Sequence, residues 1–251
     1  MPVEVTLQSE VRGSLTVYPI DSARDFGVDA FVTDRFHGTS GAPYDSLNLG
    51  DHVGDDPGHV AANRRLVAQA LGVERLVIVR QIHGAALVDA RRATSTSEAD
   101  ALFDDGDHAL AVLVADCIPI LMVDGASSRF GVVHAGWRGL AEGVITRAIQ
   151  SFSDPATVRV FLGPSISLAG YQVGPEVADV FRSVPDALVD DGGDRSRMDL
   201  RLIAAHELVA AGVDDRHIER SVQVTDGGAL FFSDRAQRPC GRFGLVAKRV
   251  S

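Results

Sequence analysis

The amino-acid sequence predicts an α+β fold in which mixed β-sheets are flanked by helices. Short β-branched apolar runs of strand length alternate with four helical stretches along the 251 residues. Strands gather at the C-terminal end, which argues against a purely parallel sheet. Neither GxGxxG nor GxxxxGKS/T occurs, so neither a dinucleotide-binding fold nor a P-loop is supported. No linker clearly divides the chain, and we expect residues 1–251 to form a single domain.

Composition excludes several classes of protein. The net charge is −10 and the basic residues are scattered, whereas binding to nucleic acid requires clustered positive charge. The N-terminus has no signal-peptide pattern, and Asp116 and Pro119 interrupt the longest apolar run, so we expect a cytoplasmic protein with no membrane partner. Two cysteines, Cys117 and Cys240, are too few for a disulfide scaffold and fit a reducing compartment.

A long polar loop and an amphipathic helix are predicted in the first third of the chain. Residues 37–56 are too rich in Gly, Asp and Asn for a regular element, and loops of this length are often binding segments. Residues 58–71 place Val60, Val67 and Leu71 on one face of a helix.

Two polar residues interrupt the apolar face of this helix. Asn63 falls inside the apolar stripe and Arg64 lies at its edge. Because unpaired burial of such groups is costly, both need partners. One interpretation is a structural pair that holds the preceding loop. The other is contact with an anion or substrate, for which arginine is well suited.

Three predicted strands each end at a residue that can bind a metal. The strands cover residues 76–82, 110–115 and 130–133. The residues that follow them are His83, Cys117 and His134. Possible metal ligands at the ends of buried strands, with a glycine-rich turn after His134, indicate a functional site rather than plain core.

The remaining elements complete the predicted fold. We expect a surface loop at 186–197 and a tight turn at 163–167. Helices are predicted at 140–152, at 199–211 and from Pro175. Further strands are predicted at 157–162, 221–225, 229–232 and 243–250.

The histidines and Cys117 allow more than one chemistry. Two His and one Cys form a plausible catalytic zinc set, because three protein ligands leave a fourth position for water. Bound zinc lowers the pKa of that water to roughly 7. From spacing alone, an ordinary buried cysteine with hydrogen-bonded histidines is the favoured interpretation, because the three segments are far apart and no local zinc motif exists. A third reading makes Cys117 a nucleophile with a histidine base, which leaves one histidine without a role.

Three motifs give the chain a likeness to a known family: QIHG at Gln81, ADCIPI at Ala115 and HAGWRGL at His134. They resemble the YfiH-like, or laccase-domain, family, whose members include proteins called polyphenol oxidases, purine nucleoside phosphorylases and peptidoglycan editing factors. The likeness covers nearly the whole chain through further segments: SLNLGDHVGDD at Ser46, VAANR at Val60, EAD at Glu98, GPSIS at Gly163, YQVG at Tyr171 and FFSDR at Phe231.

The resemblance implies a metal centre and a reaction. It implies that His83, Cys117 and His134 bind zinc, with copper as the alternative metal. Similar proteins perform phosphorolysis of adenosine, inosine, guanosine and methylthioadenosine, and deamination of adenosine. The implied partners are therefore a purine nucleoside and phosphate.

Further site residues follow from this resemblance. Arg64 and Arg138 are candidates for holding phosphate, and Asn48 and Gln81 for orienting the nucleoside. We assign Asp116 to the catalytic site, either as an acid–base group or, the role we favour, as the residue that orients a ligand histidine.

Other residues have both a binding and a structural interpretation. They are Trp137, Tyr44, His52, Ser233 and Arg235, whereas Cys240 is taken as structural. The chain departs from the family pattern at three positions, where substrate preference could differ: Val224, Asp234 and Ala236.

Other functions are compatible with the same residues. The enzymatic alternative is hydrolytic editing of a cell-wall precursor. A copper oxidase of phenols is weaker, since no second copper cluster is visible. A metal-binding interaction module is the non-enzymatic alternative. The sequence does not define the oligomeric state, and a homodimer is compatible with it.

Overall fold

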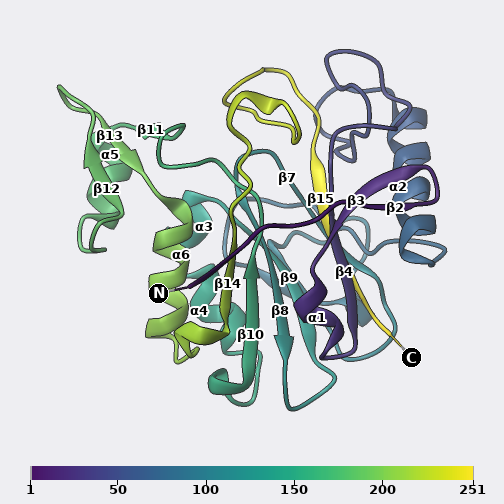
Figure 1. Ribbon diagram of the computed structural model, residues 1–251, viewed down its shortest axis with the longest axis horizontal. Helices are drawn as coiled ribbons and strands as arrows, with labels where there is room; N and C mark the ends of the chain where they lie inside the picture. The colour runs from purple at the N-terminus through teal and green to yellow at the C-terminus, as the bar shows by residue number, and fades with distance from the viewer. Residues whose placement is uncertain (1, 251) are drawn as a thin grey trace.

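Two β-sheets pack face to face and are covered by helices on their outer faces. The computed structural model describes residues 2–250. Helix α2 (Pro57–Leu71) covers the five-stranded sheet. The seven-stranded sheet is covered by helices α3 (Trp137–Ala141), α4 (Val144–Ile149) and α6 (Leu200–Ala210). Figure 1 shows α2 on one side of the strands and the other three helices on the opposite side. The predicted α+β class with mixed sheets and flanking helices is confirmed.

The larger sheet has seven strands and mixed pairing. In spatial order they are β1 (Val3–Val5), β14 (Ile218–Ser221), β10 (Val158–Leu162), β8 (Ile118–Asp124), β9 (Phe130–Ala135), β6 (Ala101–Asp104) and β5 (Leu87–Asp89). The two outer pairs at one edge and the β5–β6 pair at the other are parallel, whereas the central pairs are antiparallel.

The smaller of the two main sheets is antiparallel. Its five strands are β2 (Glu10–Arg12), β3 (Leu15–Pro19), β4 (Val28–Thr33), β15 (Phe243–Arg249) and β7 (Leu110–Val114). The C-terminal strand β15 lies between β4 and β7. The last strand of the chain therefore pairs with strands about 140 and 220 residues earlier in the sequence, as in the Ala247–Leu110 and Ala247–Ala30 pairs, which makes the fold depend on contacts distant in sequence.

Alternating side chains build separate cores on the two faces of each strand. In β10, Val160 and Leu162 pack under the helices, whereas Phe161 points between the sheets. In β7, Val112 points between the sheets and Leu113 packs towards α2. Because both faces are covered, these strands are continuous apolar runs in the sequence.

Helix α2 (Pro57–Leu71) is bounded by strong end signals. The carboxylate of Asp56 accepts hydrogen bonds from the backbone N–H groups of Gly58 and His59, and Pro57 occupies the first turn. Gly72 ends the helix with φ 70°, a conformation that favours glycine. The predicted helix is confirmed and begins one residue earlier than expected.

The other helices are shorter. The α-helices are α1 (Asp21–Arg24), α3 (Trp137–Ala141), α4 (Val144–Ile149), α5 (Pro175–Ala178) and α6 (Leu200–Ala210), and the 3-10 helices are η1 (Ala90–Arg92), η2 (Pro155–Thr157), η3 (Asp179–Phe181), η4 (Asp215–His217) and η5 (Asp226–Gly228). Among residues 2–250 no helix is long and apolar enough to cross a membrane.

A third, small sheet projects from the body of the protein. Its strands are β11 (Gln172–Val173), β13 (Ser196–Met198) and β12 (Leu188–Asp190). Figure 1 shows it extending from the helical side. The prediction of a plain loop over 186–197 was wrong, since this stretch contains β12 and the first residues of β13, although its tip at Gly192–Gly193 has the expected glycine turn.

The predicted strand at 76–82 is wrong, and its hydrogen bonds explain why. The segment is extended, but Val77 pairs with Ala109 and Ala111 beside the five-stranded sheet, whereas Arg80 pairs with Ser97 and Ala99 beside the other sheet. A segment that crosses between two sheets forms isolated bridges instead of a ladder. Apolar content alone cannot distinguish a strand within one sheet from an extended segment that crosses between two sheets.

Three other predicted elements differ from the structure. The helix expected at 140–152 is two helices, α3 and α4, because Gly143 adopts φ 81° between them. Residues 229–232 form no strand: Phe231 and Phe232 are fully buried in the core between the sheets, but their backbone joins no ladder. The strand expected at 221–225 is β14, which ends at Ser221.

A substitution at Gly131 tests the packing of the seven-stranded sheet. A Cβ atom here would overlap the ring of Phe103 and lie 2.8 Å from the carbonyl oxygen of Leu102. Gly131→Ala is expected to lower the free energy of unfolding by about 1–3 kcal/mol, measured by urea denaturation. Gly41→Ala, where a Cβ meets nothing within 4 Å, is the control. If the free energy of unfolding of Gly131→Ala equals that of the parent, this packing is contradicted.

Glu207 on α6 predicts a pH dependence of stability. Burial raises the pKa of its carboxyl group to about 7, and its buried Oε2 has no hydrogen-bond partner among residues 2–250. Since the folded pKa exceeds the unfolded value of about 4.5, ionisation of this group removes stability as pH rises between those two values. Glu207→Gln should therefore be more stable than the parent at pH 8, with the difference shrinking towards pH 5. Urea midpoints measure this, and the exposed Glu74→Gln is the control.

Candidate metal centre

His83, Cys117 and His134 lie together although they are far apart in sequence. Their ligand atoms are all within 4.8 Å of one another. His134 is in β9, and Cys117 lies between β7 of one sheet and β8 of the other. His83 ends the segment that crosses between the sheets. The group suggests a metal-binding site, because two imidazoles and a thiolate form a donor set typical of transition-metal centres.

One buried carboxylate positions both histidines. Asp100 is fully buried, and its Oδ1 lies 2.8 Å from Nδ1 of His134. The same carboxylate accepts hydrogen bonds from the backbone N–H groups of His83, at 2.9 Å, and Gly84, at 2.7 Å. His83 has φ 58°, an uncommon conformation for a non-glycine residue, and these bonds support it. A carboxylate on Nδ1 leaves Nε2 of His134 free to bind a metal.

Glycine is required where the chain passes the thiol. A Cβ atom on Gly136 would lie 2.8 Å from Sγ of Cys117 and 3.5 Å from Cδ2 of His83. A Cβ atom on Gly139 would lie 2.9 Å from the carbonyl oxygen of Gly84. The glycines that follow His134 therefore permit the close approach of α3 to the three ligand residues.

Asp116 does not orient a histidine, so that interpretation was wrong. Its carboxylate instead accepts hydrogen bonds from Oγ1 of Thr225, at 2.6 Å, and from the backbone N–H of Arg235, at 2.7 Å. Its backbone has φ 84°. Asp116 thus connects the turn before Cys117 to the C-terminal segment, while Asp100 has the orienting role. Sequence reasoning missed Asp100, although the EAD segment contains it.

The thiol and the imidazoles shift one another's pKa. Burial raises the pKa of Cys117, but the neighbouring His134 and His83 lower it to about 6. Burial lowers the pKa of His134, and Cys117 and Asp100 raise it to about 9. Cys117 is therefore readily ionised, and a thiolate is the form that binds metals or attacks an electrophile.

A cavity of about 300 Å³ opens above the three ligand residues. Four arginines line it: Arg138, Arg235, Arg238 and Arg242. The guanidinium of Arg138 lies 4.5 Å from the ring centroid of Trp137, and that of Arg235 lies 5.3 Å from the ring centroid of Tyr171. In a chain with a net charge of −10, this concentration of positive charge favours an anionic ligand.

The four predicted substrate contacts have different outcomes. Arg138 lines the cavity, but it lies within α3, a helix of five residues, so the predicted turn before a long helix was wrong. Gln81 lines the cavity while its amide pairs with both backbone groups of Leu113. Arg64 lies in an adjoining cavity, which also contains Gln81.

Asn48 is placed away from the cavity, and the prediction that it orients a nucleoside is contradicted. It is fully buried, and its amide bonds Gly50, Asp55 and the backbone N–H of Arg242. The loop at 37–56 and the backbone of Arg242 therefore occupy all its hydrogen-bonding capacity.

Asn63 and Arg64 hold the same loop, which supports their structural interpretation. The Asn63 amide bonds Thr39, Ser40 and the carbonyl oxygens of residues 46 and 48. Nε of Arg64 donates to the carbonyl oxygen of Leu49 at 2.9 Å. The helix thereby fixes the loop.

The structure also distinguishes between the binding and the structural interpretation of the remaining candidate residues. His52, Trp137 and Arg235 line the cavity. Tyr44 braces its own loop by donating to the carbonyl oxygen of Val53, and Ser233 is buried and accepts a hydrogen bond from the backbone of Ala236. The cavity also contains Tyr171, Asp234, Arg238 and Arg242, for which spacing gave no signal.

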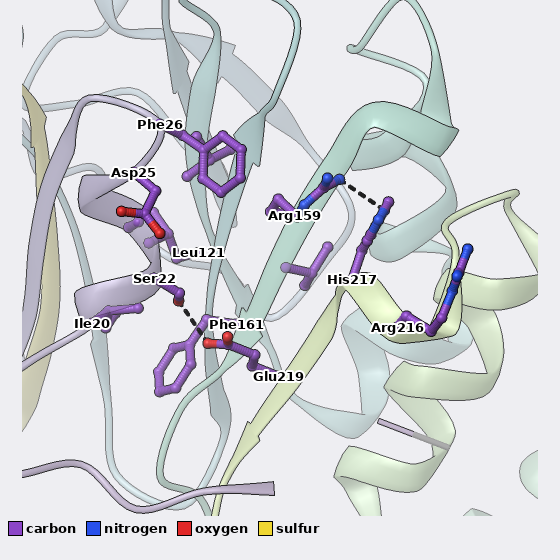
Figure 2. Close-up of a pocket in the computed structure, with 13 residues that line it drawn as sticks. Ile20, Ser22, Asp25, Phe26, Leu121, Arg159, Phe161, Arg216, His217 and Glu219 are labelled. Carbon is purple, nitrogen blue, oxygen red and sulfur yellow. Dashed lines mark hydrogen bonds between the residues drawn. The ribbon is translucent and has the colours of Figure 1, made fainter. Parts of the chain in front are cut away.

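A separate cavity of about 230 Å³ lies beside α1 and strands β8, β10 and β14. Figure 2 shows Arg159 pointing towards His217, and Ser22 towards Glu219. These polar groups are paired with one another, and the cavity contains none of the three ligand residues. It is distinct from the metal centre.

Comparison with known proteins identifies relatives that match most of the chain. It is 39% identical over 225 residues to a purine nucleoside phosphorylase of Mycobacterium tuberculosis, covering 86% of this chain and 89% of the relative. It is 35% identical to the purine nucleoside phosphorylase YfiH of Escherichia coli K12, covering 86% and 91%. The crystal structure of YlmD from Geobacillus stearothermophilus has a TM-score of 0.88 and 31% identity, covering 98% and 99%.

The match to a family model covers most of the chain. Residues 29–249 match the family described as multi-copper polyphenol oxidoreductase laccase. This agrees with the laccase-domain resemblance of the three sequence motifs, and the structural likeness extends over nearly the whole length. The chain belongs to this laccase-domain, or YfiH-like, family.

Proposed function

We propose that the protein is a zinc-dependent purine nucleoside phosphorylase. The observation that carries the proposal is one cavity that combines the His83–Cys117–His134 group with an arginine cluster. The first suits a metal and the second suits phosphate. Relatives at 35–39% identity are named purine nucleoside phosphorylases.

Zinc is the metal that we assign to the three ligand residues. Their donor atoms are close enough to share one ion, zinc binds both imidazole nitrogen and thiolate sulfur, and three protein ligands leave a fourth position open. The tight carboxylate bond on His134 is the outer partner that metal-bound histidines usually have. When bound, zinc supplies a Lewis acid and lowers the pKa of a coordinated water.

The phosphate is assigned to Arg138 and Arg235. Both guanidinium groups face the cavity, and neither forms an ion pair with a carboxylate among the described residues. Arg235 donates to the carbonyl oxygen of Gln172, which fixes its direction. Guanidinium groups recognise phosphate oxygens in pairs. Arg64, in the adjoining cavity, remains a second candidate for an anion contact.

Phosphorolysis needs little from the protein beyond binding and orientation. A phosphate oxygen forms a bond to C1′ of the ribose, the bond from C1′ to the purine nitrogen breaks, and the purine takes up a proton. Trp137 and Tyr171 offer aromatic surface in the cavity wall for a flat base. Two arginines would hold the phosphate dianion beside it, which supplies proximity.

We also propose adenosine deamination at the same centre. Three protein ligands leave a fourth position for water, and water is the co-substrate that replaces the amino group at C6 of adenine. The two reactions differ in product, since deamination yields inosine and ammonia.

The role of Asp100 predicts a loss of metal affinity. Asp100→Asn keeps the size of the side chain but removes the charge that holds Nδ1 of His134 and two backbone N–H groups. We expect zinc affinity to fall about 10- to 100-fold, measured by competition with a chromogenic chelator. Asp105→Asn, an exposed acid, is the control. Equal affinity in the Asp100→Asn and parent proteins would contradict the positioning role.

Product analysis tests the proposed activity. Zinc-loaded protein with adenosine and phosphate should form adenine and ribose 1-phosphate, together with inosine from deamination. Cys117→Ala should lower both rates by at least about 100-fold, because the site loses one of three ligands. Cys240→Ala removes the other thiol and is the matched control. Absence of all these products with the parent protein would refute the proposal.

A further inference from the structure

The metal cavity continues outwards into two further hollows. These have volumes of about 380 and 410 Å³. Asp234 and Arg238 line all three spaces, and Arg242 lines the inner cavity and one outer hollow. We call Asp234, Arg238 and Arg242 the outer mouth. The shared lining residues place the three spaces next to one another.

The outer mouth carries a net positive charge. Nε of Arg238 donates to Oδ2 of Asp234 at 2.6 Å, and a guanidinium nitrogen of Arg242 lies 3.4 Å from Oδ1. One carboxylate thus lies between two guanidinium groups. Arg242 also donates to the carbonyl oxygens of Cys240 and Gly241, which holds it in place. The Arg238 side chain is 78% exposed, so a ligand can reach its guanidinium group by competing with Asp234.

An anion bound in the outer hollows would be remote from the reacting bond. The outer hollows contain none of His83, Cys117 and His134. In the proposed reaction the attacking phosphate lies in the inner cavity beside Arg138, which lines neither outer hollow, whereas Arg235 lines the inner cavity and one outer hollow. An anionic group at the outer mouth is therefore a second one, carried by the part of the substrate that points outwards.

We propose that the outer mouth binds a negatively charged substituent of the purine nucleoside substrate, so that the preferred substrates include nucleoside monophosphates. This rests on the proposed function and extends it to a substrate class. Asp234 holds the two arginines together when the mouth is empty, and a phosphate group displaces it from them. Arginine prefers such oxygen-rich groups because its planar donors match them in pairs.

Calorimetric binding of two probes tests this inference. Adenosine 5′-monophosphate is expected to bind the zinc-loaded protein about tenfold more tightly than adenosine. Arg238→Gln, an exposed substitution, should reduce this ratio to about threefold or less. Asp234→Asn should increase the ratio, because the competing carboxylate is lost. Arg182→Gln is the matched control, since Arg182 is similarly exposed and pairs with a nearby aspartate, Asp179.

Two results would overturn the inference. One is equal affinity for the two probes in the parent protein. The other is an affinity ratio of the two probes that Arg238→Gln leaves unchanged. If Arg138→Gln then removes the preference for the monophosphate, the anion binds at the inner arginines instead of the outer mouth. Phosphorolysis of adenosine without any preference for the monophosphate refutes this inference alone. If neither probe binds or reacts, the proposed function itself fails.

Discussion

The metal centre depends on the buried carboxylate of Asp100. This group holds Nδ1 of His134 and the backbone at His83, so that one side chain determines the position of two of the three ligand residues. Burial of a carboxylate is costly unless it is fully hydrogen-bonded. Here burial opposes ionisation, and the bonds from His134, Gly84 and His83 outweigh it, which lowers the pKa of Asp100 below its usual range. The same bonds that stabilise the charge therefore also shape the site.

The site forms where the two sheets meet. The chain passes from β7 in one sheet to β8 in the other through Asp116 and Cys117, and the segment ending at His83 crosses between the sheets beside it. Asp116 is tied to the C-terminal segment through Thr225 and Arg235. The two sheets and the chain end thus contribute to one cavity. A structure built from both sheets holds these residues more rigidly than a single loop could.

Electrostatics divides the cavity wall into two arginine groups. Arg138 and Arg235 line the metal cavity and have no acidic partner among residues 2–250 of the structure, although Arg235 also lines one outer hollow. Arg238 and Arg242 instead share Asp234 at the outer mouth. An acidic chain that concentrates arginines in one cleft attracts anions there and repels them elsewhere. In the proposed arrangement, the attacking phosphate binds beside the reacting bond, and the outer mouth binds a charged group that the substrate itself carries.

By itself, the sequence determined the fold class, helix α2, strands β7, β9, β10 and β15, and the three ligand residues, the last through family motifs. Local signals suffice for these because apolar runs, capping residues and motifs are properties of neighbouring residues. Only the tertiary structure decided that residues 76–82 bridge two sheets, that Asn48 bonds its own loop and the backbone of Arg242, and that Asp100 rather than Asp116 positions His134. Hydrogen-bond partners distant in sequence determine each of these, and no local pattern contains them.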